Sequence, residues 1–133
     1  MDRQRTTTTT SKRSGNVGRR TLSASTLIGD SVMNHAGDDL GNLKDIMLDV
    51  DEGRIAYGVL ESGGFLGLGA KLFAIPFEAF GIDPERNVLI LNVDAETIQN
   101  AEGFDPDNWP DTTDPDFSLR THEHYGYRPY WER

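Results

Sequence analysis

Three histidines offer the side chains best suited to metal or acid–base chemistry. His122 and His124 flank Glu123, and His35 precedes an acidic turn. Residues at i and i+2 share a face only on a strand, and a zinc site needs further ligands. No acids stand at ligand spacing near either stretch. We therefore expect His35 to lie in a solvated turn, and His122 and His124 to have structural or surface roles, with metal binding as the alternative.

A glycine-rich run at residues 62–71 invites comparison with a phosphate-binding loop. A Walker A loop requires Lys directly after its last glycine, followed by Ser or Thr. Here Ala70 separates Gly69 from Lys71, and no Gly-x-Gly-x-x-Gly spacing can be drawn. The run instead predicts a loop whose large apolar residues fold over a barrel mouth or contact a partner protein. These residues are Phe65, Leu66 and Leu68.

No catalytic arrangement is recognisable elsewhere in the sequence. It shows no nucleophile–base pairing, no paired-carboxylate motif and no cofactor fingerprint. Without cysteine, disulfides and thiolate metal sites are excluded. We therefore expect a protein that is not an enzyme and that uses no cofactor.

Length and hydropathy restrict the class of protein further. A chain of 133 residues accommodates one domain with extensions. No apolar run reaches the length of a membrane span, and nothing near residue 1 has the apolar middle region of a signal peptide. We expect a cytoplasmic protein without a transmembrane segment.

Charge divides the chain into two unlike parts. The first 20 residues hold six Lys or Arg against one Asp, about +5, and the remainder holds seven against 21 acids, about −14. Because nucleic-acid affinity depends on basic residues that neutralise phosphates, we expect no direct nucleic-acid binding by the acidic body. Residues 1–20 have too few apolar groups to fold and are predicted to be a disordered basic arm. A solvated leader is favoured over a peripheral contact with anionic lipid or with nucleic acid.

The body is organised around a predicted hairpin at residues 40–61. Before Gly53, every second residue is a large aliphatic one, and after it Ile55, Tyr57 and Val59 alternate with Ala56, Gly58 and Leu60, which is the period of half-buried strands. Gly53 can adopt the positive φ that a short hairpin turn favours. The alternation predicts one buried face made by Ile46, Leu48, Val50, Ile55, Tyr57 and Val59.

Shorter elements complete the predicted fold. A helical turn is expected within residues 21–30, strands at 31–34, 71–75 and 88–93, and a short helix within 94–100 that Asp94 caps. Short strands separated by turns are typical of a small antiparallel barrel or sandwich. The predicted class is mainly β: a small antiparallel β-barrel with one short helix after the last strand and an irregular C-terminal tail.

The ordered series of motifs in residues 21–103 resembles the PRC-barrel family. The motifs are Gly37-Asp38-Asp39-Leu40-Gly41, Asp45-Ile46-Met47-Leu48-Asp49, Gly53-Arg54-Ile55-Ala56-Tyr57, Gly63-Gly64-Phe65-Leu66-Gly67-Leu68-Gly69 and Ile75-Pro76. Domains of this family form the cytoplasmic part of the photosynthetic reaction-centre H subunit and the C-terminal domain of a ribosome-maturation factor. The resemblance implies a small β-barrel that serves as an interaction module, with no family-wide catalytic residues.

Residues 104–133 form the third predicted part, an acidic extension anchored by aromatic side chains. Pro106, Pro110 and Pro115 argue against regular structure here, yet both Trp and three of the four Tyr lie in this extension. Such residues are typical of docking anchors, so we expect them to dock on the protein's own barrel or on that of a second chain. The expected anchors are Trp109, Tyr125, Tyr127, Tyr130 and Trp131.

These features favour a non-enzymatic barrel that acts through protein–protein contacts, with a homodimer expected. A barrel of this size buries a small fraction of its surface, and docking of the extension, in cis or in trans, would stabilise it. The alternative is a small-molecule or metal-binding protein that uses the barrel mouth together with His122 and His124. The predicted interaction residues are those of the glycine-rich loop and the five C-terminal anchors.

Overall fold

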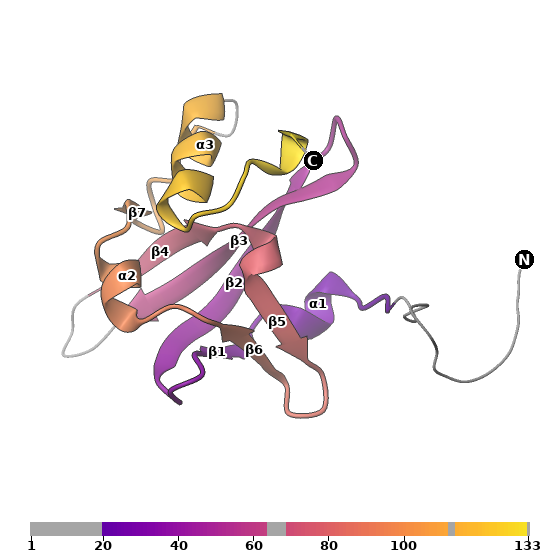
Figure 1. Ribbon diagram of the computed structural model, residues 1–133, viewed down its shortest axis with the longest axis vertical. Coiled ribbons are helices and arrows are strands. Elements are labelled where there is room, and N and C mark those ends of the chain that lie inside the picture. The colour runs from indigo at the N-terminus through magenta and orange to yellow at the C-terminus, as the bar shows by residue number, and fades with distance from the viewer. Residues whose placement is uncertain (1–19, 64–68, 112–113, 133) are drawn as a thin grey trace, which may run out of the picture.

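The long hairpin of strands β2 (Asp39–Asp49) and β3 (Arg54–Gly63) is the centre of the fold (Figure 1). The computed structural model describes residues 20–63, 69–111 and 114–132. The hairpin turn has the predicted form, because Gly53 adopts φ 68° and its N–H donates to the Asp49 carbonyl at 2.8 Å. The Asp49 carboxylate also accepts from the N–H groups of Asp51 and Glu52. This turn fixes the register of the hairpin.

Five more strands extend the hairpin into a seven-stranded sheet. The remaining elements are α1 (Ala24–Leu27), β1 (Ser31–Met33), β4 (Ala70–Ile75), the 3₁₀ turn η2 (Phe77–Ala79), β5 (Phe80–Asp83), β6 (Val88–Leu91), α2 (Ala95–Gln99), β7 (Gly103–Phe104), α3 (Pro115–His124) and the 3₁₀ turn η3 (Tyr130–Glu132). The short helix at α2 was predicted with its cap, and Asp94 accepts from the Thr97 N–H at 2.9 Å.

The strand order is β5-β6-β1-β2-β3-β4-β7. The mainly β class is thus confirmed, but two details of the prediction change. Strand β1 pairs with β6 in parallel, so the sheet is not wholly antiparallel. In the described part of the chain β5 and β7 are edges with no ladder between them, so the sheet curls around its core without closing by hydrogen bonds.

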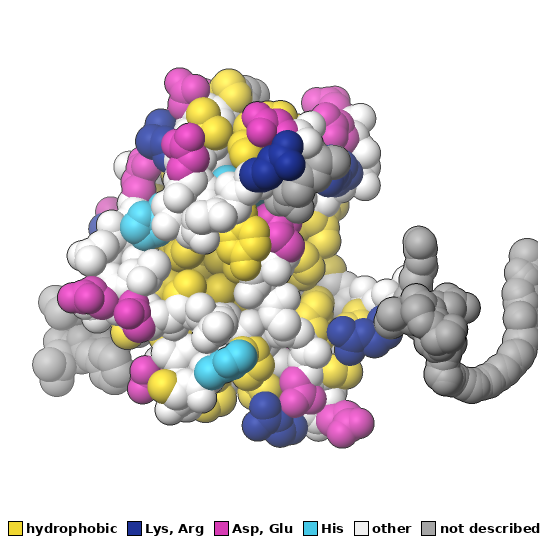
Figure 2. All heavy atoms as spheres, in the orientation of Figure 1, with side chains coloured by type: hydrophobic (Ala, Val, Ile, Leu, Met, Phe, Trp, Pro, Cys, Tyr) yellow, Lys and Arg dark blue, Asp and Glu magenta, His cyan; other side chains and the backbone are white. Residues whose placement is uncertain are grey.

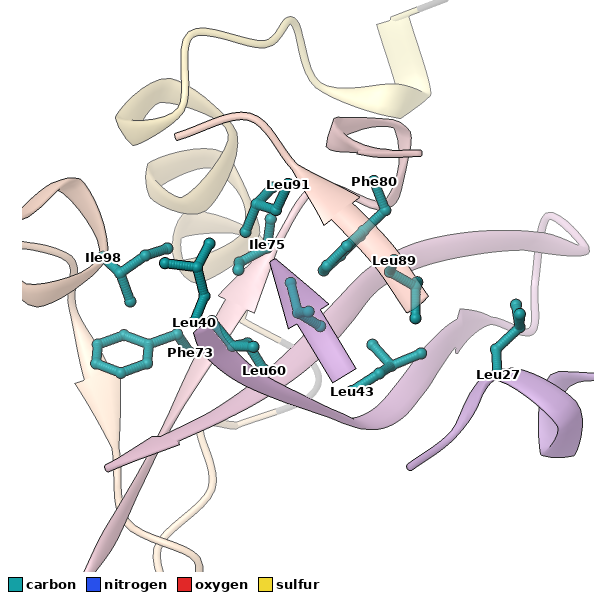
Figure 3. Packing of buried hydrophobic residues seen from close by; sticks show 11 residues of the cluster. Leu27, Leu40, Leu43, Leu60, Phe73, Ile75, Phe80, Leu89, Leu91 and Ile98 are labelled. Atoms are coloured by element: carbon teal, nitrogen blue, oxygen red, sulfur yellow. The ribbon is translucent and has the colours of Figure 1, made fainter. Parts of the chain in front are cut away.

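One hydrophobic cluster fills the concave side of the sheet, and we call it the inner cluster. Its side chains converge from six strands, while Leu27 of α1 and Ile98 of α2 lie at opposite ends (Figure 3). The buried members are Leu27, Val32, Leu40, Leu43, Leu60, Phe73, Ile75, Phe80, Leu89, Leu91 and Ile98. Aliphatic and Phe side chains thus fill the interior of the curled sheet.

A second cluster, the outer cluster, covers the other face of β3 and β4. Side chains alternate along β4, so that Leu72 and Ala74 point outward while Phe73 and Ile75 point inward. The extension seals the outward face with Phe104 and Phe117, and α3 lies over these strands (Figure 1). Its buried members are Tyr57, Val59, Leu72, Ala74, Phe104 and Phe117.

The predicted irregular C-terminal tail is therefore wrong. Residues 115–124 form a regular helix, because Pro115 stands in its first turn, where a missing N–H costs nothing. The side chain of Asp114 caps the helix by accepting from the Asp116 N–H at 2.9 Å.

The predicted buried face of the hairpin is only partly correct. Tyr57 and Val59 are buried in the outer cluster, whereas the half-buried Ile46 packs on the inner cluster of the opposite face, and Leu48 and Val50 are 64% and 82% exposed. Ile55 is also exposed, at 37%. The reason is that β1 pairs with β2 only along residues 39–42, and β4 pairs with β3 only along residues 58–63. Residues 44–57, which we call the hairpin tip, extend beyond both neighbours.

Candidate functional site

A groove of about 850 Å³ lies between the hairpin tip and the C-terminal segment. Residues 47–52 and 56–57 of the tip form one wall. The opposite wall combines the start of α3 with the turn η3, and Figure 1 shows this turn beside the tip. Segments that lie far apart in the sequence thus build one surface.

The floor and walls of the groove are apolar. Met47, Tyr57 and Phe117 line it where it meets the outer cluster. Leu48 and Val50 stand at its outer end together with Trp131, which is 38% exposed. A contiguous group of exposed large apolar side chains is typical of a surface that binds a partner.

Carboxylates surround this apolar surface. Figure 2 shows hydrophobic, acidic and basic side chains side by side where α3 and the hairpin tip lie. Among the described lining residues none is Lys or Arg, and five are acidic: Asp49, Asp51, Glu52, Asp111 and Asp114. Arg54 offsets part of this charge, because it lies 3.7 Å from Glu52.

Tyr130 joins the two walls of the groove. Its hydroxyl donates to the Asp49 carboxylate at 2.5 Å, and the Arg54 guanidinium lies 5.2 Å from the centre of its ring. The bond from Tyr130 lowers the pKa of Asp49 below its ordinary value, with help from the Glu52 N–H. Burial, followed by the bond to Asp49, raises the pKa of Tyr130. Both shifts favour the hydrogen-bonded pair at neutral pH.

The two histidines of the extension make separate contacts. On a helix, positions i and i+2 do not share a face, so His122 and His124 point in different directions. His122 is fully buried and its Nδ1–H donates to the Ser118 carbonyl at 2.8 Å, while Nε2 faces Glu78 at 3.8 Å. His124 donates from Nε2 to the Thr97 carbonyl at 3.0 Å.

Because the segment is helical, the two histidines lack the shared face that a strand would give them. No group of three or more His, Asp or Glu side chains within the described residues is placed to hold a metal ion. His35 lies exposed in a turn, as predicted.

Arg120 provides a further connection between α3 and the sheet domain. Its guanidinium donates to both carboxylate oxygens of Glu102, at 2.9 and 3.1 Å. This bidentate contact lowers the pKa of Glu102 and raises that of Arg120. The extension is therefore attached to its own chain by polar contacts as well as by the outer cluster.

The predicted C-terminal anchors separate into two groups. Tyr130 and Trp131 line the groove, whereas Trp109 packs on the outer cluster and Tyr125 on the inner one. Tyr127 is half-buried. The three apolar residues predicted in the glycine-rich loop, Phe65, Leu66 and Leu68, lie outside the described residues.

Sequence reasoning missed the exposed residues of the groove, Leu48 and Val50, because it assigned both to the core. A signal was present: every polar position between Asp45 and Asp51 is acidic, which is unusual beside a covered strand.

Comparison with known proteins identifies the family of this chain. The PRC-barrel domain family matches residues 20–98, which is more than half of the chain. The chain belongs to the PRC-barrel family. The matched region ends before β7, so α3 and the C-terminal wall of the groove lie outside this PRC-barrel match.

One solved structure with a similar fold is that of a protein described as a 16S ribosomal RNA processing protein, RimM, from Pseudomonas aeruginosa. It is 18% identical, with a TM-score of 0.41, over 56% of this chain and 45% of that one. This PRC-barrel chain thus spans less than half the length of that protein. No curated protein matches the present chain. In the described part of the chain no helix is long and apolar enough to cross a membrane.

Proposed function

We propose that this PRC-barrel chain is a non-enzymatic interaction module and that a partner protein docks in the groove beside the hairpin tip. The observation that carries the proposal is the exposure of Leu48 and Val50, at 64% and 82%, on a strand pair that extends beyond the sheet. Exposed large aliphatic side chains are unfavourable in water unless a partner covers them. The groove next to them provides a concave apolar surface of the kind that receives a side chain.

The contacts of the extension indicate that the C-terminal wall of the groove is formed before a partner binds. The outer cluster, the Arg120–Glu102 contact and the Tyr130–Asp49 bond hold the C-terminal wall against its own sheet. Binding therefore requires little ordering of this wall, which reduces the free-energy cost of association.

Self-association belongs to the same proposal. Because the extension docks in cis, a dimer is not needed to cover its aromatic residues. A homodimer through the groove and the hairpin tip is the less favoured form of the proposal, because the acidic residues of two tips would face each other. The cytoplasmic location expected from the sequence stays a prediction.

Site-specific photo-crosslinking in the producing cell tests the proposal. A benzoylphenylalanine at position 50 should give discrete crosslinked products, identified by mass spectrometry, whereas the same residue at position 28, directly after α1, should not. Ile28 is a matched control because it is also an exposed aliphatic residue, at 39%. A product of twice the chain mass would indicate a homodimer. Equal, diffuse labelling from both positions would contradict a docking surface at the tip.

A further inference from the structure

We infer that the partner segment that occupies the groove is cationic and amphipathic, with Lys or Arg on both sides of an apolar anchor. This inference rests on the docking function proposed above and adds the chemistry of the partner. It follows from two properties of the same surface, its apolar floor and its acidic rim.

The rim carries charge on both walls. Asp51 and Glu52 belong to the hairpin turn, whereas Asp111 and Asp114 belong to the segment that leads into α3. A bound segment would therefore pass between two acidic edges, and basic residues flanking its anchor would meet a carboxylate on either side. An acidic segment would be repelled from both edges.

The chain's own bases offset part of this rim charge, because Arg54 lies 3.7 Å from Glu52 and the charge of Arg120 acts on Asp114. The balance among the described lining residues remains acidic, since five of them are Asp or Glu and none is Lys or Arg. Tyr130 donates a neutral hydroxyl to Asp49 and lowers the pKa of that carboxyl, so Asp49 stays ionised. A basic partner would neutralise the negatively charged rim of a chain whose net charge is −9.

The apolar floor of the groove requires that the partner segment carry an apolar anchor in addition to its positive charge. Met47, Tyr57 and Phe117 form a hydrophobic base between the acidic edges, and Leu48, Val50 and Trp131 extend it outward. A polybasic segment without apolar residues would leave this surface in contact with water. The apolar floor thus selects against purely polar cations.

Three short peptides of equal length provide the probes: one alternating Lys and Leu, one alternating Glu and Leu, and one alternating Lys and Ser. Each carries a fluorescent label, and binding to the full-length chain is followed by anisotropy. The Lys–Leu peptide should bind tightest, and its affinity should fall as salt screens the charges. Fluorescence of Trp131 should change with the same midpoint.

Paired variants locate the binding on the groove. Asp51→Asn with Glu52→Gln should weaken the Lys–Leu peptide roughly three- to tenfold, whereas Glu85→Gln with Asp107→Asn, two exposed acids elsewhere, should leave it unchanged. Leu48→Ser with Val50→Ser should weaken it about tenfold, and Leu22→Ser with Ile28→Ser should not. Both apolar pairs are exposed, so neither should disturb the fold.

The outcomes separate this inference from the proposed function. Equal or tighter binding of the Glu–Leu peptide, abolished by the Leu48/Val50 pair, would overturn the cationic partner while the docking function stands. No groove-dependent binding of any peptide, together with no specific crosslink at position 50, would overturn both. Stronger Lys–Leu binding after removal of residues 1–19 would overturn an external partner and make the chain's own basic arm the occupant.

Discussion

The base and the tip of the β2–β3 hairpin have similar sequences and opposite environments. At the base, Val59 and Leu60 are both fully buried, on opposite faces of the same strand. At the tip, Leu48 and Val50 are mostly exposed. The difference arises from neighbours, because β1 and β4 flank only the base and the C-terminal segment contacts one side of the tip. Burial of an apolar strand residue thus depends on what lies beside the strand.

The largest expected effect is on the packing of α3 against the outer cluster of the hairpin. Phe117 of α3 is 5% exposed and packs edge-on against Tyr57 and Phe104, with ring centroids 6.0 and 6.2 Å apart. Phe117→Ala should lower the free energy of unfolding by about 3–5 kcal/mol, measured by urea denaturation with Trp109 fluorescence. Phe117→Leu is the matched control and should cost much less. A shift below about 1 kcal/mol for the alanine variant would show that α3 does not seal the base.

The next effect tests the inner side of the base. Leu60 is fully buried in the inner cluster, so Leu60→Ala removes packing that nothing nearby can replace. We expect a loss of about 2–5 kcal/mol in the same urea experiment. An unchanged midpoint would mean that the inner cluster does not support the sheet.

The sheet could be predicted from the sequence because its signals are local. Alternation, the Gly53 turn and the Asp94 cap each act within a few residues, and all three are present in the structure. The curled sheet without closure could not be predicted in this way, since closure depends on whether distant edges such as β5 and β7 meet.

The sequence contains a signal for the layer that covers the outer face of β3 and β4, and the prediction did not use it. Consecutive apolar residues, 57–60 in β3 and 72–75 in β4, indicate strands buried on both faces, and a second layer must then exist. Asp114 followed by Pro115 marks the start of the helix that supplies it. The groove itself was beyond sequence reasoning, because its two walls are separated by about half the chain.

A smaller effect is expected at the contact that joins the tip to the extension. Asp49 has a pKa below its ordinary value of 3.8, so its contribution to stability is present above that pH and is lost as pH falls below it. Tyr130 has a raised pKa, so its contribution is present below pH 10.0 and is lost as pH rises beyond it. Tyr130→Phe should therefore reduce the dependence of the urea midpoint on pH, both below pH 3.8 and above pH 10.0. Tyr127→Phe is the control and should retain the wild-type profile.

The smallest effect is expected at the tip itself. Leu48 is 64% exposed, so its side chain gains little burial on folding, and Leu48→Ala should change the free energy of unfolding by less than about 0.5 kcal/mol. Leu60→Ala on the same hairpin is the natural reference, since both changes remove the same atoms. The alternation of the sequence assigns Leu48 to the core, and on that basis the two variants would be equally damaging. A loss above about 2 kcal/mol for Leu48→Ala would mean that the tip is covered in solution, by a second copy or by the arm. Repeating the measurement at several protein concentrations separates these occupants, because stabilisation by a second copy increases with concentration and stabilisation by the arm does not.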